Sequence, residues 1–180
     1  MKYSIGLRVV IVNGMPESGK TTFENMCADI LTPAFCRTRS TVDKIKEIAK
    51  EGGWTGTKNL EDRKFLSDLK DLFTDYNDMP FNDIIKFLKG WETDLEYYGV
   101  GSHKHVLFVD DREPEHIDRL KKELNAVTLL IEREEVANQI VSNHSDGNVY
   151  DYDYDYIIKN NGDLADLGEQ ALIFLNWIFS

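Results

Sequence analysis

Long apolar segments are missing from this sequence of 180 residues. Apolar runs such as residues 9–12 and 106–109 have the length of a buried strand, whereas a membrane-spanning helix needs about 18–20 apolar residues. A secretory signal peptide ends in a cleavage site of small residues. The N-terminal stretch MKYSIGLRVVIVNG has no such site after its apolar part. We therefore expect a cytoplasmic protein that has no membrane partner.

Positive charge and cysteine are also scarce. Lysine and arginine total 21 against 32 aspartates and glutamates, which gives a formal net charge of −11. Such an excess of negative charge disfavours non-specific binding to nucleic acid, so we expect no nucleic-acid partner. The two cysteines, Cys27 and Cys36, match no zinc-binding spacing, and we expect reduced thiols in or near the core.

The pattern of apolar residues is that of an α/β protein. Hydrophobic residues make up 42% of the chain, enough for a core, and the length suits a single domain over residues 1–180. Short apolar runs predict five strands, at residues 7–13, 34–37, 105–109, 127–131 and 155–158. Helical spacing predicts helices at residues 20–31, 41–50, 60–76, 81–98, 113–124, 133–141 and 164–179. We predict three layers, a five-stranded parallel sheet and a helical insert, residues 41–98, between the second and third strands.

The segment GMPESGKT, residues 14–21, matches the pattern G-x-x-x-x-G-K-[ST] and lies between a predicted strand and a predicted helix. In this setting the N–H groups of the loop form a nest for anions, and the dipole of the following helix adds to the same site. The pattern therefore predicts a phosphate-binding loop (P-loop) that holds ATP. The nucleotide-binding residues that we predict are Gly14, Met15, Pro16, Glu17, Ser18, Gly19, Lys20, Thr21 and Thr22.

Two residues of this chain are predicted to hold Mg²⁺. Lys20 is expected to reach the β and γ phosphates, while the hydroxyl of Thr21 binds the metal ion. Parallel strands deliver the residues at their C-terminal ends to the ligand, and the apolar run VLFV ends in Asp110. We predict that Asp110 is the second metal-binding residue. Asp111 is the competing candidate, and a simple turn or helix cap is the alternative for Asp110.

Two arginines follow the third and fourth predicted strands. Arg112 comes directly after the acidic pair, and Arg133 ends the sequence IER. Phosphoryl transfer needs positive charge over the moving group, so we predict that Lys20, Arg112 and Arg133 are the catalytic residues. The alternative for each arginine is a surface position beside an acidic neighbour.

Further basic residues occur before and within the insert. Arg37 and Arg39 follow the second predicted strand, and Lys58, Arg63 and Lys64 surround the turn into the long helix. A kinase that acts on a phosphorylated substrate needs a second cationic clamp, and we predict that these residues supply it. A solvated helix face is the alternative for the helix residues. The run DYDYDY at residues 151–156 is expected to be a solvated turn that leads into a strand.

Four segments carry a family resemblance and together touch most of the chain: NGMPESGKTTF, GGWTGTKNLEDRKFLSDLKDLFTDYND, VDDREPEHIDRLKK and SNHSDGNVYDYDYDYIIKNNGDLADL. They resemble the nucleoside monophosphate kinases, and more narrowly the phage-type deoxynucleoside monophosphate kinases. The resemblance implies that Arg37, Arg39 and the stretch from Trp54 to Lys64 face the nucleotide acceptor. It also implies that Arg112 is the arginine that such kinases carry after the third strand. Packing is the alternative role for Trp54.

These features predict an ATP- and Mg²⁺-dependent phosphotransferase that moves the γ-phosphoryl group to a nucleoside monophosphate, with small-molecule nucleotides as partners. A regulatory GTPase is excluded, because the chain has no guanine-reading N-K-x-D and no D-x-x-G after the third strand. The lid, residues 133–143, is short and carries one arginine, which keeps a non-catalytic nucleotide-binding protein open. A kinase of another small phosphorylated metabolite would show the same pattern. The sequence also leaves a homodimer open.

Overall fold

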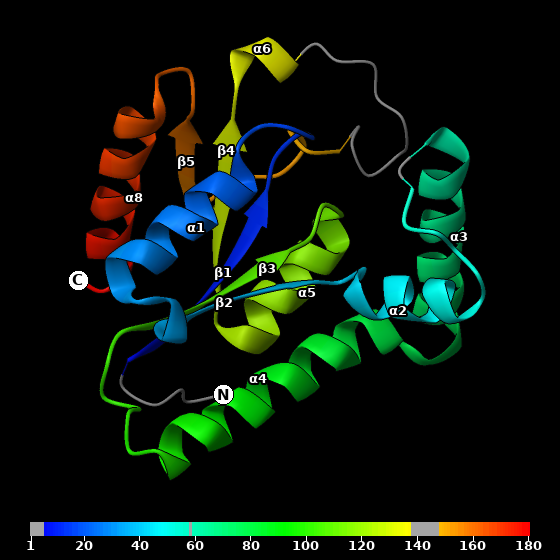
Figure 1. Cartoon of the computed structure of the whole chain (residues 1–180), viewed down its shortest axis with the longest axis horizontal. Coiled ribbons are helices and arrows are strands. Elements are labelled where there is room, and N and C mark those ends of the chain that lie inside the picture. The colour runs from blue at the N-terminus through cyan, green and yellow to red at the C-terminus, as the bar shows by residue number, and fades with distance from the viewer. Residues whose placement is uncertain (1–5, 58, 138–147) are drawn as a thin grey trace.

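A five-stranded sheet forms the centre of the computed structural model, which describes residues 6–57, 59–137 and 148–180 (Figure 1). The strands are β1 (Leu7–Asn13), β2 (Cys36–Ser40), β3 (His105–Asp110), β4 (Val127–Glu132) and β5 (Tyr156–Lys159). They pair in the order β2-β3-β1-β4-β5, and every pair is parallel. The predicted α/β fold with a five-stranded parallel sheet is confirmed.

Helices connect the strands and lie close to the expected positions. They are α1 (Lys20–Leu31), α2 (Asp43–Glu51), α3 (Leu60–Asn77), α4 (Met79–Tyr97), α5 (Pro114–Leu124), α6 (Glu134–Ala137) and α8 (Leu164–Ile178). The second strand starts later than predicted. Pro33 lacks an N–H and fixes its own φ, so it opens a 3₁₀ turn, η1 (Pro33–Phe35), instead of a strand. Of the helix predicted at residues 133–141, the last four residues lie outside the described ranges.

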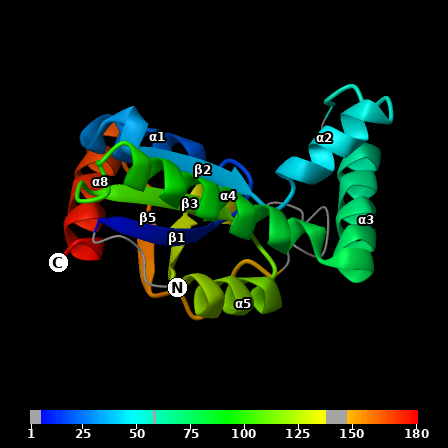
Figure 2. The ribbon, with the colours of Figure 1, turned by 90° about the horizontal axis from the view of Figure 1, so that it is seen from below.

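Helices cover both faces of the sheet and produce three layers (Figure 2). On one face, Val12 of β1 belongs to an apolar cluster with Phe23 of α1 and Phe174 of α8. On the other face, Ile11 of β1 belongs to a cluster with Leu88 of α4 and with residues of α5. The pleat of the strands explains this division, because successive side chains point to opposite faces. Across the described ranges, no helix is long and apolar enough to cross a membrane.

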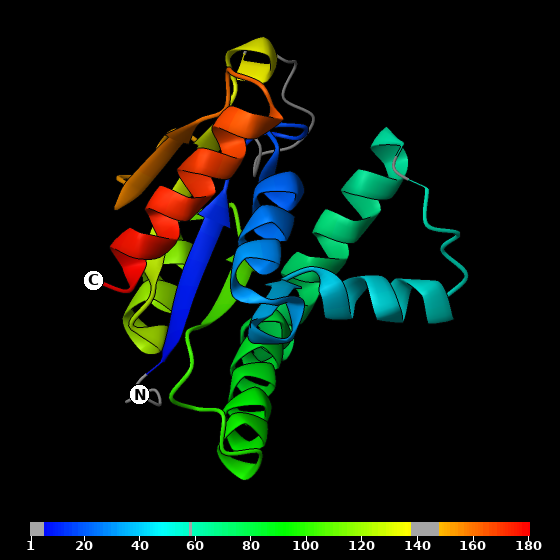
Figure 3. The same cartoon turned by 60° about the vertical axis from the view of Figure 1, so that its left-hand side comes forward.

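The insert between β2 and β3 consists of α2, α3 and α4. Helix α4 buries one face against the sheet, whereas α3 packs against α2 and α4 and stands to the side of the sheet (Figure 3). Several apolar side chains of α3 are exposed, including Leu60, Leu72 and Tyr76. The side chain of α3 that is buried is Lys70. Helix α3 is therefore attached to the rest of the fold by charge as well as by apolar packing.

An ion cluster around Asp111 joins α3 to the end of β3. Asp111 is 3% exposed, and its Oδ1 accepts hydrogen bonds from the backbone N–H groups of Arg112 (2.7 Å) and Glu113 (3.1 Å). Nζ of Lys70 lies 3.7 Å and Nδ1 of His116 lies 3.8 Å from the same oxygen. Burial opposes ionisation of Asp111, but these neighbours outweigh it and lower its pKa to about 2. The ionised carboxylate thus ties the insert to the sheet.

Replacing Asp111 with Asn is expected to lower the free energy of unfolding by roughly 2–4 kcal/mol at neutral pH, because Lys70 would be left buried without a counter-charge. A carboxylate whose pKa falls on folding from 3.8 to about 2 stabilises the protein above its unfolded pKa, and this contribution is lost as the pH falls toward 2. The difference between wild type and Asp111→Asn is therefore expected to be constant above about pH 5 and to shrink between about pH 4 and 2. Denaturant unfolding across this range measures the difference.

Asp68→Asn is the matched control, because Asp68 forms a 2.6 Å ion pair with Lys64 on the same helix but at an exposed position. Its effect on the free energy of unfolding is expected to stay within about 0.5 kcal/mol at every pH. Equal losses for the two variants would show that Asp111 does not anchor the insert.

Candidate nucleotide-binding site

The predicted phosphate-binding segment forms a tight loop between β1 and α1. Gly14 (φ 150°) and Gly19 (φ 100°) have backbone angles that other residues rarely adopt. A Cβ on Gly14 would lie 2.5 Å from the carbonyl oxygen of Ile131, and one on Gly19 would lie 2.3 Å from Nδ2 of Asn160. Both glycines are therefore required, since the loop packs closely against β4 and the end of β5.

Donor groups gather at this loop. Nζ of Lys20 donates hydrogen bonds to the carbonyl oxygens of Gly14 (2.6 Å) and Met15 (3.0 Å). Oγ of Ser18 is buried and has no hydrogen-bond partner among the described residues. Gly19 supplies no side-chain cap to α1, so the first N–H groups of this helix are available to a ligand. A lysine, a buried hydroxyl and an uncapped helix N-terminus together fit an anion.

A hydrogen-bond network that the sequence analysis missed holds the start of the loop. Oδ1 of Asn13 accepts a hydrogen bond from the N–H of Gly14 (2.7 Å), and its Nδ2 donates one to the hydroxyl oxygen of Tyr154 (2.7 Å). Tyr154 in turn donates to the carbonyl oxygen of Val149 (2.8 Å), and burial raises its pKa to about 12. The run at residues 151–156, expected to be a solvated turn, thus buries Tyr154 at 8% exposure.

Asn160, directly after β5, holds the second half of the loop and was also missed. Its Nδ2 donates a hydrogen bond to the carbonyl oxygen of Ser18 (2.9 Å), and its N–H donates to that of Glu132 (2.7 Å). Asn160 is therefore fixed by β4 on one side and fixes the loop on the other.

A cleft of about 540 Å³ opens beside the loop. This volume lies within the range of small-molecule sites. The cleft therefore has room, between the start of α1 and the turn from β5 to α8, for the parts of a nucleotide beyond its phosphates. Its lining residues are Glu17, Gly19, Lys20, Thr21, Thr22, Arg133, Asn160, Gly162, Asp163, Leu164 and Leu167.

Two carboxylates lie on the α1 side of the sheet near Lys20. Asp110 ends β3 at an alternate position to Phe108, so the pleat directs both toward α1. Glu24 of α1 is 5% exposed, and its Oε2 accepts a hydrogen bond from the hydroxyl of Thr38 (3.4 Å). Burial raises the pKa of Glu24 to about 8, and the charge of Asp110 adds to this rise. Burial also raises the pKa of Asp110, which the charge of Lys20 opposes.

The oxygen atoms near the loop fit Mg²⁺. Oδ1 of Asp110 is buried on the α1 side and has no hydrogen-bond partner among the described residues. Oδ2 of Asp111 also lacks one, but Asp111 lies in the ion cluster with Lys70 of the insert. The hydroxyl of Thr21 stands at the exposed start of α1, and hydroxyl and carboxylate oxygens suit this metal. Within the described ranges, no group of three or more His, Cys, Asp and Glu side chains is placed to hold a metal ion. A magnesium ion would therefore need water and phosphate oxygens to complete its coordination.

The two predicted catalytic arginines lie at the edge of the sheet that carries the loop. The carbonyl oxygen of Arg112 accepts a hydrogen bond from Nδ2 of Asn13 (3.4 Å), and the Arg112 charge acts on Asp110. Arg133 lines the cleft, and its guanidinium donates to the carboxylate of Glu135. Arg112 therefore contacts the start of the loop and Arg133 lines the cleft beside it, from opposite sides of β1.

Two of the predicted acceptor residues, Arg37 and Arg39, face away from α1. They alternate with Thr38 along β2, so their side chains lie on the α4 side of the sheet. The guanidinium of Arg39 lies 4.1 Å from the ring centroid of Phe87. The guanidinium of Arg37 lies 5.7 Å from the ring centroid of Trp91. A groove of about 400 Å³ is found here. Its lining residues are Arg37, Arg39, Asp83, Lys86, Phe87, Gly90, Trp91 and Asp94.

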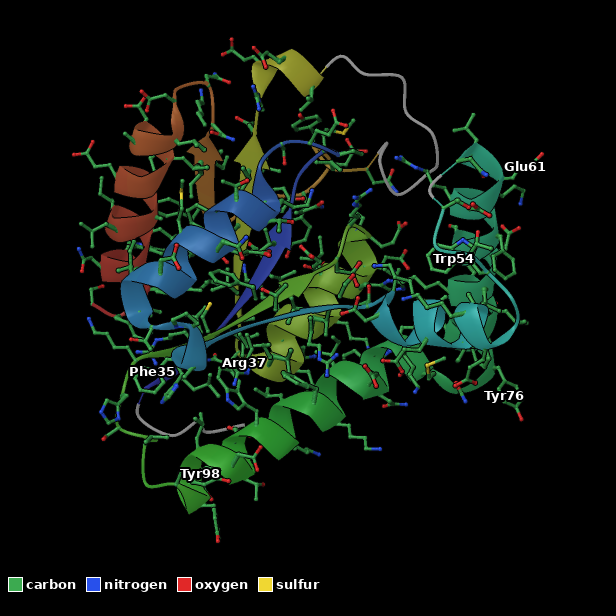
Figure 4. All side chains as sticks on the ribbon, in the orientation of Figure 1. Phe35, Arg37, Trp54, Glu61, Tyr76 and Tyr98 are labelled. Carbon is green, nitrogen blue, oxygen red and sulfur yellow. The ribbon has the colours of Figure 1, made fainter. Side chains whose placement is uncertain are left out.

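The remaining predicted acceptor residues belong to α3 and to the loop before it. Trp54 lies beside α3 and well apart from Arg37 (Figure 4). Lys64 pairs with Asp68 on the exposed face of α3, and Arg63 follows the first turn of the same helix. Lys58 lies outside the described residues. The structure therefore does not bring Arg37 and Trp54 together around one small ligand.

No family model matches the chain, and no curated protein matches it. Among solved structures, a sugar kinase from Janibacter sp. HTCC2649 is 18% identical, with 94% of this chain and 95% of that chain covered and a TM-score of 0.48. A thymidylate kinase from Ehrlichia chaffeensis is 13% identical (94% and 99% covered, TM-score 0.49), and a shikimate kinase from Aquifex aeolicus vf5 is 12% identical (94% and 97%, TM-score 0.47). Likenesses at this level assign the chain to no family and identify no substrate.

Asn160→Ala is expected to weaken the binding of ATP·Mg²⁺ roughly five- to tenfold, because the carbonyl of Ser18 loses the donor that holds the loop in its binding shape. The free energy of unfolding is expected to fall by about 1 kcal/mol. Isothermal titration calorimetry measures the affinity.

Asn161→Ala is the matched control, because the neighbouring amide donates to Glu134 (2.8 Å) at an exposed position. This variant is expected to bind ATP·Mg²⁺ as wild type does. If both variants bind like wild type, Asn160 does not position the loop.

Proposed function

We propose that this chain is an ATP- and Mg²⁺-dependent phosphotransferase that moves the γ-phosphoryl group of ATP to a (deoxy)nucleoside monophosphate. The observation that carries the proposal is the geometry of the phosphate loop. Gly14 and Gly19 allow the loop to pack against β4 and Asn160, while Lys20 and the uncapped start of α1 lie at the same place. This is the arrangement of groups that binds a polyphosphate.

Each residue at the site has a distinct role in the proposed reaction. Lys20 contacts the β and γ phosphates, and Thr21 and Asp110 hold the metal. Mg²⁺, when bound, neutralises charge on these phosphates. Arg112 and Arg133 stabilise the negative charge that spreads over the moving phosphoryl group. The cleft of about 540 Å³ next to the loop supports a place for the sugar and base of ATP.

The acceptor is proposed to bind against the insert, residues 41–98. A kinase must keep water away from the γ-phosphate until the acceptor is in place, and this requires a segment that completes the site when the acceptor binds. Helix α3 suits this role, because it stands to the side of the sheet and is anchored by Lys70. Arg63 and Lys64 are proposed to contact the acceptor phosphate from this helix.

A non-catalytic nucleotide-binding protein is the second candidate function. The positions of Arg37 and Arg39 on the α4 side of the sheet favour it, since two of the proposed acceptor cations then lie away from the phosphate loop. A kinase of another small phosphorylated metabolite would use the same loop. Assays of ATP binding and of phosphoryl transfer separate these functions.

Lys20→Ala is expected to weaken ATP·Mg²⁺ binding roughly 10- to 100-fold, because a charge-assisted contact with the phosphates is lost. The melting temperature without nucleotide is expected to fall modestly, since Lys20 bonds carbonyl oxygens of its own loop and its charge favours ionised Asp110. Calorimetry and thermal unfolding measure the two effects. Lys44→Ala, at an exposed ion pair with Glu47, is the control. Equal affinity of wild type and Lys20→Ala would refute ATP binding at this loop.

ADP release from ATP is expected to be slow alone and to accelerate with one or more nucleoside monophosphates, because the acceptor completes the site and excludes water. A coupled assay over the common ribo- and deoxyribonucleoside monophosphates measures this. The double variant Arg63→Ala, Lys64→Ala is expected to raise KM for the acceptor while the affinity for ATP stays nearly unchanged.

Two results would contradict this picture. If no monophosphate accelerates ADP release, the acceptor is of another class or the protein only binds nucleotide. If the double variant loses ATP affinity instead, the start of α3 serves the donor nucleotide or the fold.

A further inference from the structure

Glu24 is a buried carboxylate that no motif accounts for. It lies in α1, three residues after Thr21 and four after Lys20, and is 5% exposed. Its Oε2 accepts one long hydrogen bond from the hydroxyl of Thr38 (3.4 Å), and its Oε1 is buried with no partner among the described residues. A buried carboxylate oxygen without a partner is costly, so it points to a ligand that is absent from the protein alone.

Helix geometry places Glu24 beneath the phosphate site. Each residue turns the α-helix by about 100° and advances it by about 1.5 Å. Around the helix axis, Glu24 is therefore rotated by about 40° from Lys20 and by about 60° from Thr21, so it lies between them. Along the axis it lies about one turn further from the loop. Lys20, predicted to contact the phosphates, and Thr21, predicted to bind the metal, therefore lie on either side of Glu24 around the helix.

Asp110 approaches the same space from the sheet. The pleat of β3 directs it toward α1, and its Oδ1 is also buried without a partner among the described residues. The charge of Asp110 acts on Glu24 from the end of β3. Each of these two carboxylates thus has a buried oxygen without a partner among the described residues, and Lys20 is the cation that acts on both of them.

We propose that Glu24 is a third protein contributor to the Mg²⁺ site, where it would contact the waters of the ion that Thr21 and Asp110 would hold. The inference rests on the proposed function, since it needs a metal–nucleotide complex on the loop. Mg²⁺ keeps several of its waters and is commonly held by one or two carboxylates together with phosphate oxygens, which matches two buried carboxylates beside a phosphate loop.

Burial distinguishes this role from that of a catalytic base. A general base must come within hydrogen-bond reach of the proton that it takes from the acceptor. Glu24 is 5% exposed, beneath the first turn of α1 and against Thr38 of β2, so an acceptor in the open cleft does not reach it. A hydrated metal ion held by Thr21 and Asp110 would reach Glu24 through its waters, because Glu24 follows Thr21 by about one turn of α1 and the charge of Asp110 acts on it.

Manganese binding in the presence of ADP tests the proposal, with Mn²⁺ as the probe and electron paramagnetic resonance as the readout. Glu24→Gln is expected to raise the dissociation constant for Mn²⁺ about tenfold or more, as loss of a metal-orienting group does. Its affinity for ADP without metal is expected to match wild type, because no contact to the phosphates is removed. Glu24→Asp keeps the carboxylate on a shorter side chain. Its dissociation constant for Mn²⁺ is expected to lie between those of wild type and Glu24→Gln.

Asp29→Asn is the matched control, because it removes one carboxylate charge from an exposed position of the same helix. It is expected to bind Mn²⁺ as wild type does. Wild-type Mn²⁺ affinity for Glu24→Gln would overturn the proposal, as would an equal loss of ADP affinity with and without metal. Should Glu24→Gln fail to fold, as judged by thermal unfolding, wild-type Mn²⁺ affinity for Glu24→Asp would overturn it instead. Failure of wild type to bind ADP at all would refute the proposed function, which is a distinct result.

Discussion

The charged groups that the sheet contributes to the phosphate loop depend on one constraint, which is the alternation of side chains along parallel strands. The C-terminal ends of β1, β3 and β4 meet at the loop, and the pleat then decides which face each side chain serves. Asp110 and Thr38 point toward α1, whereas Arg37 and Arg39 point toward α4. A shift of one residue in register would exchange these sets and would leave the loop without its carboxylate.

The phosphate loop and most helices could be predicted because their signals are local. The eight residues of the motif and the helix that follows form one continuous segment, so spacing alone identifies them. The residues that hold the loop in place could not be found this way, since Ser18 and Asn160 are 142 positions apart. A weak signal did exist for Tyr154, as tyrosines alternate with aspartates through residues 151–156 and alternation is typical of a half-buried segment.

Helical periodicity on α1 indicates which of its side chains the core buries. Phe23 and Cys27 of α1 are fully buried, whereas Ile30, three residues after Cys27, is 44% exposed near the end of the helix. Glu24 lies beside Phe23 and three residues before Cys27, so the same periodicity places a charge at the edge of the core. On α3, the basic pair Arg63 and Lys64 was predicted to contact the acceptor, whereas the lysine that the fold buries is Lys70, opposite Asp111. Its partner lies beyond α4 in sequence, which no local pattern shows.

The charge around the loop bears on which form of nucleotide it binds. Glu17 lines the cleft with a backbone φ of 64°, Asp110 lies beneath the start of α1, and the whole chain carries a net charge of −11. Free ATP brings its own negative charges into this field, and repulsion from like charges opposes its binding. A bound divalent cation makes the electrostatic contribution to nucleotide binding favourable, because the phosphates and the protein carboxylates both attract it. The same side chains that would weaken binding of the free nucleotide therefore favour its metal complex, which is the form that phosphoryl transfer requires.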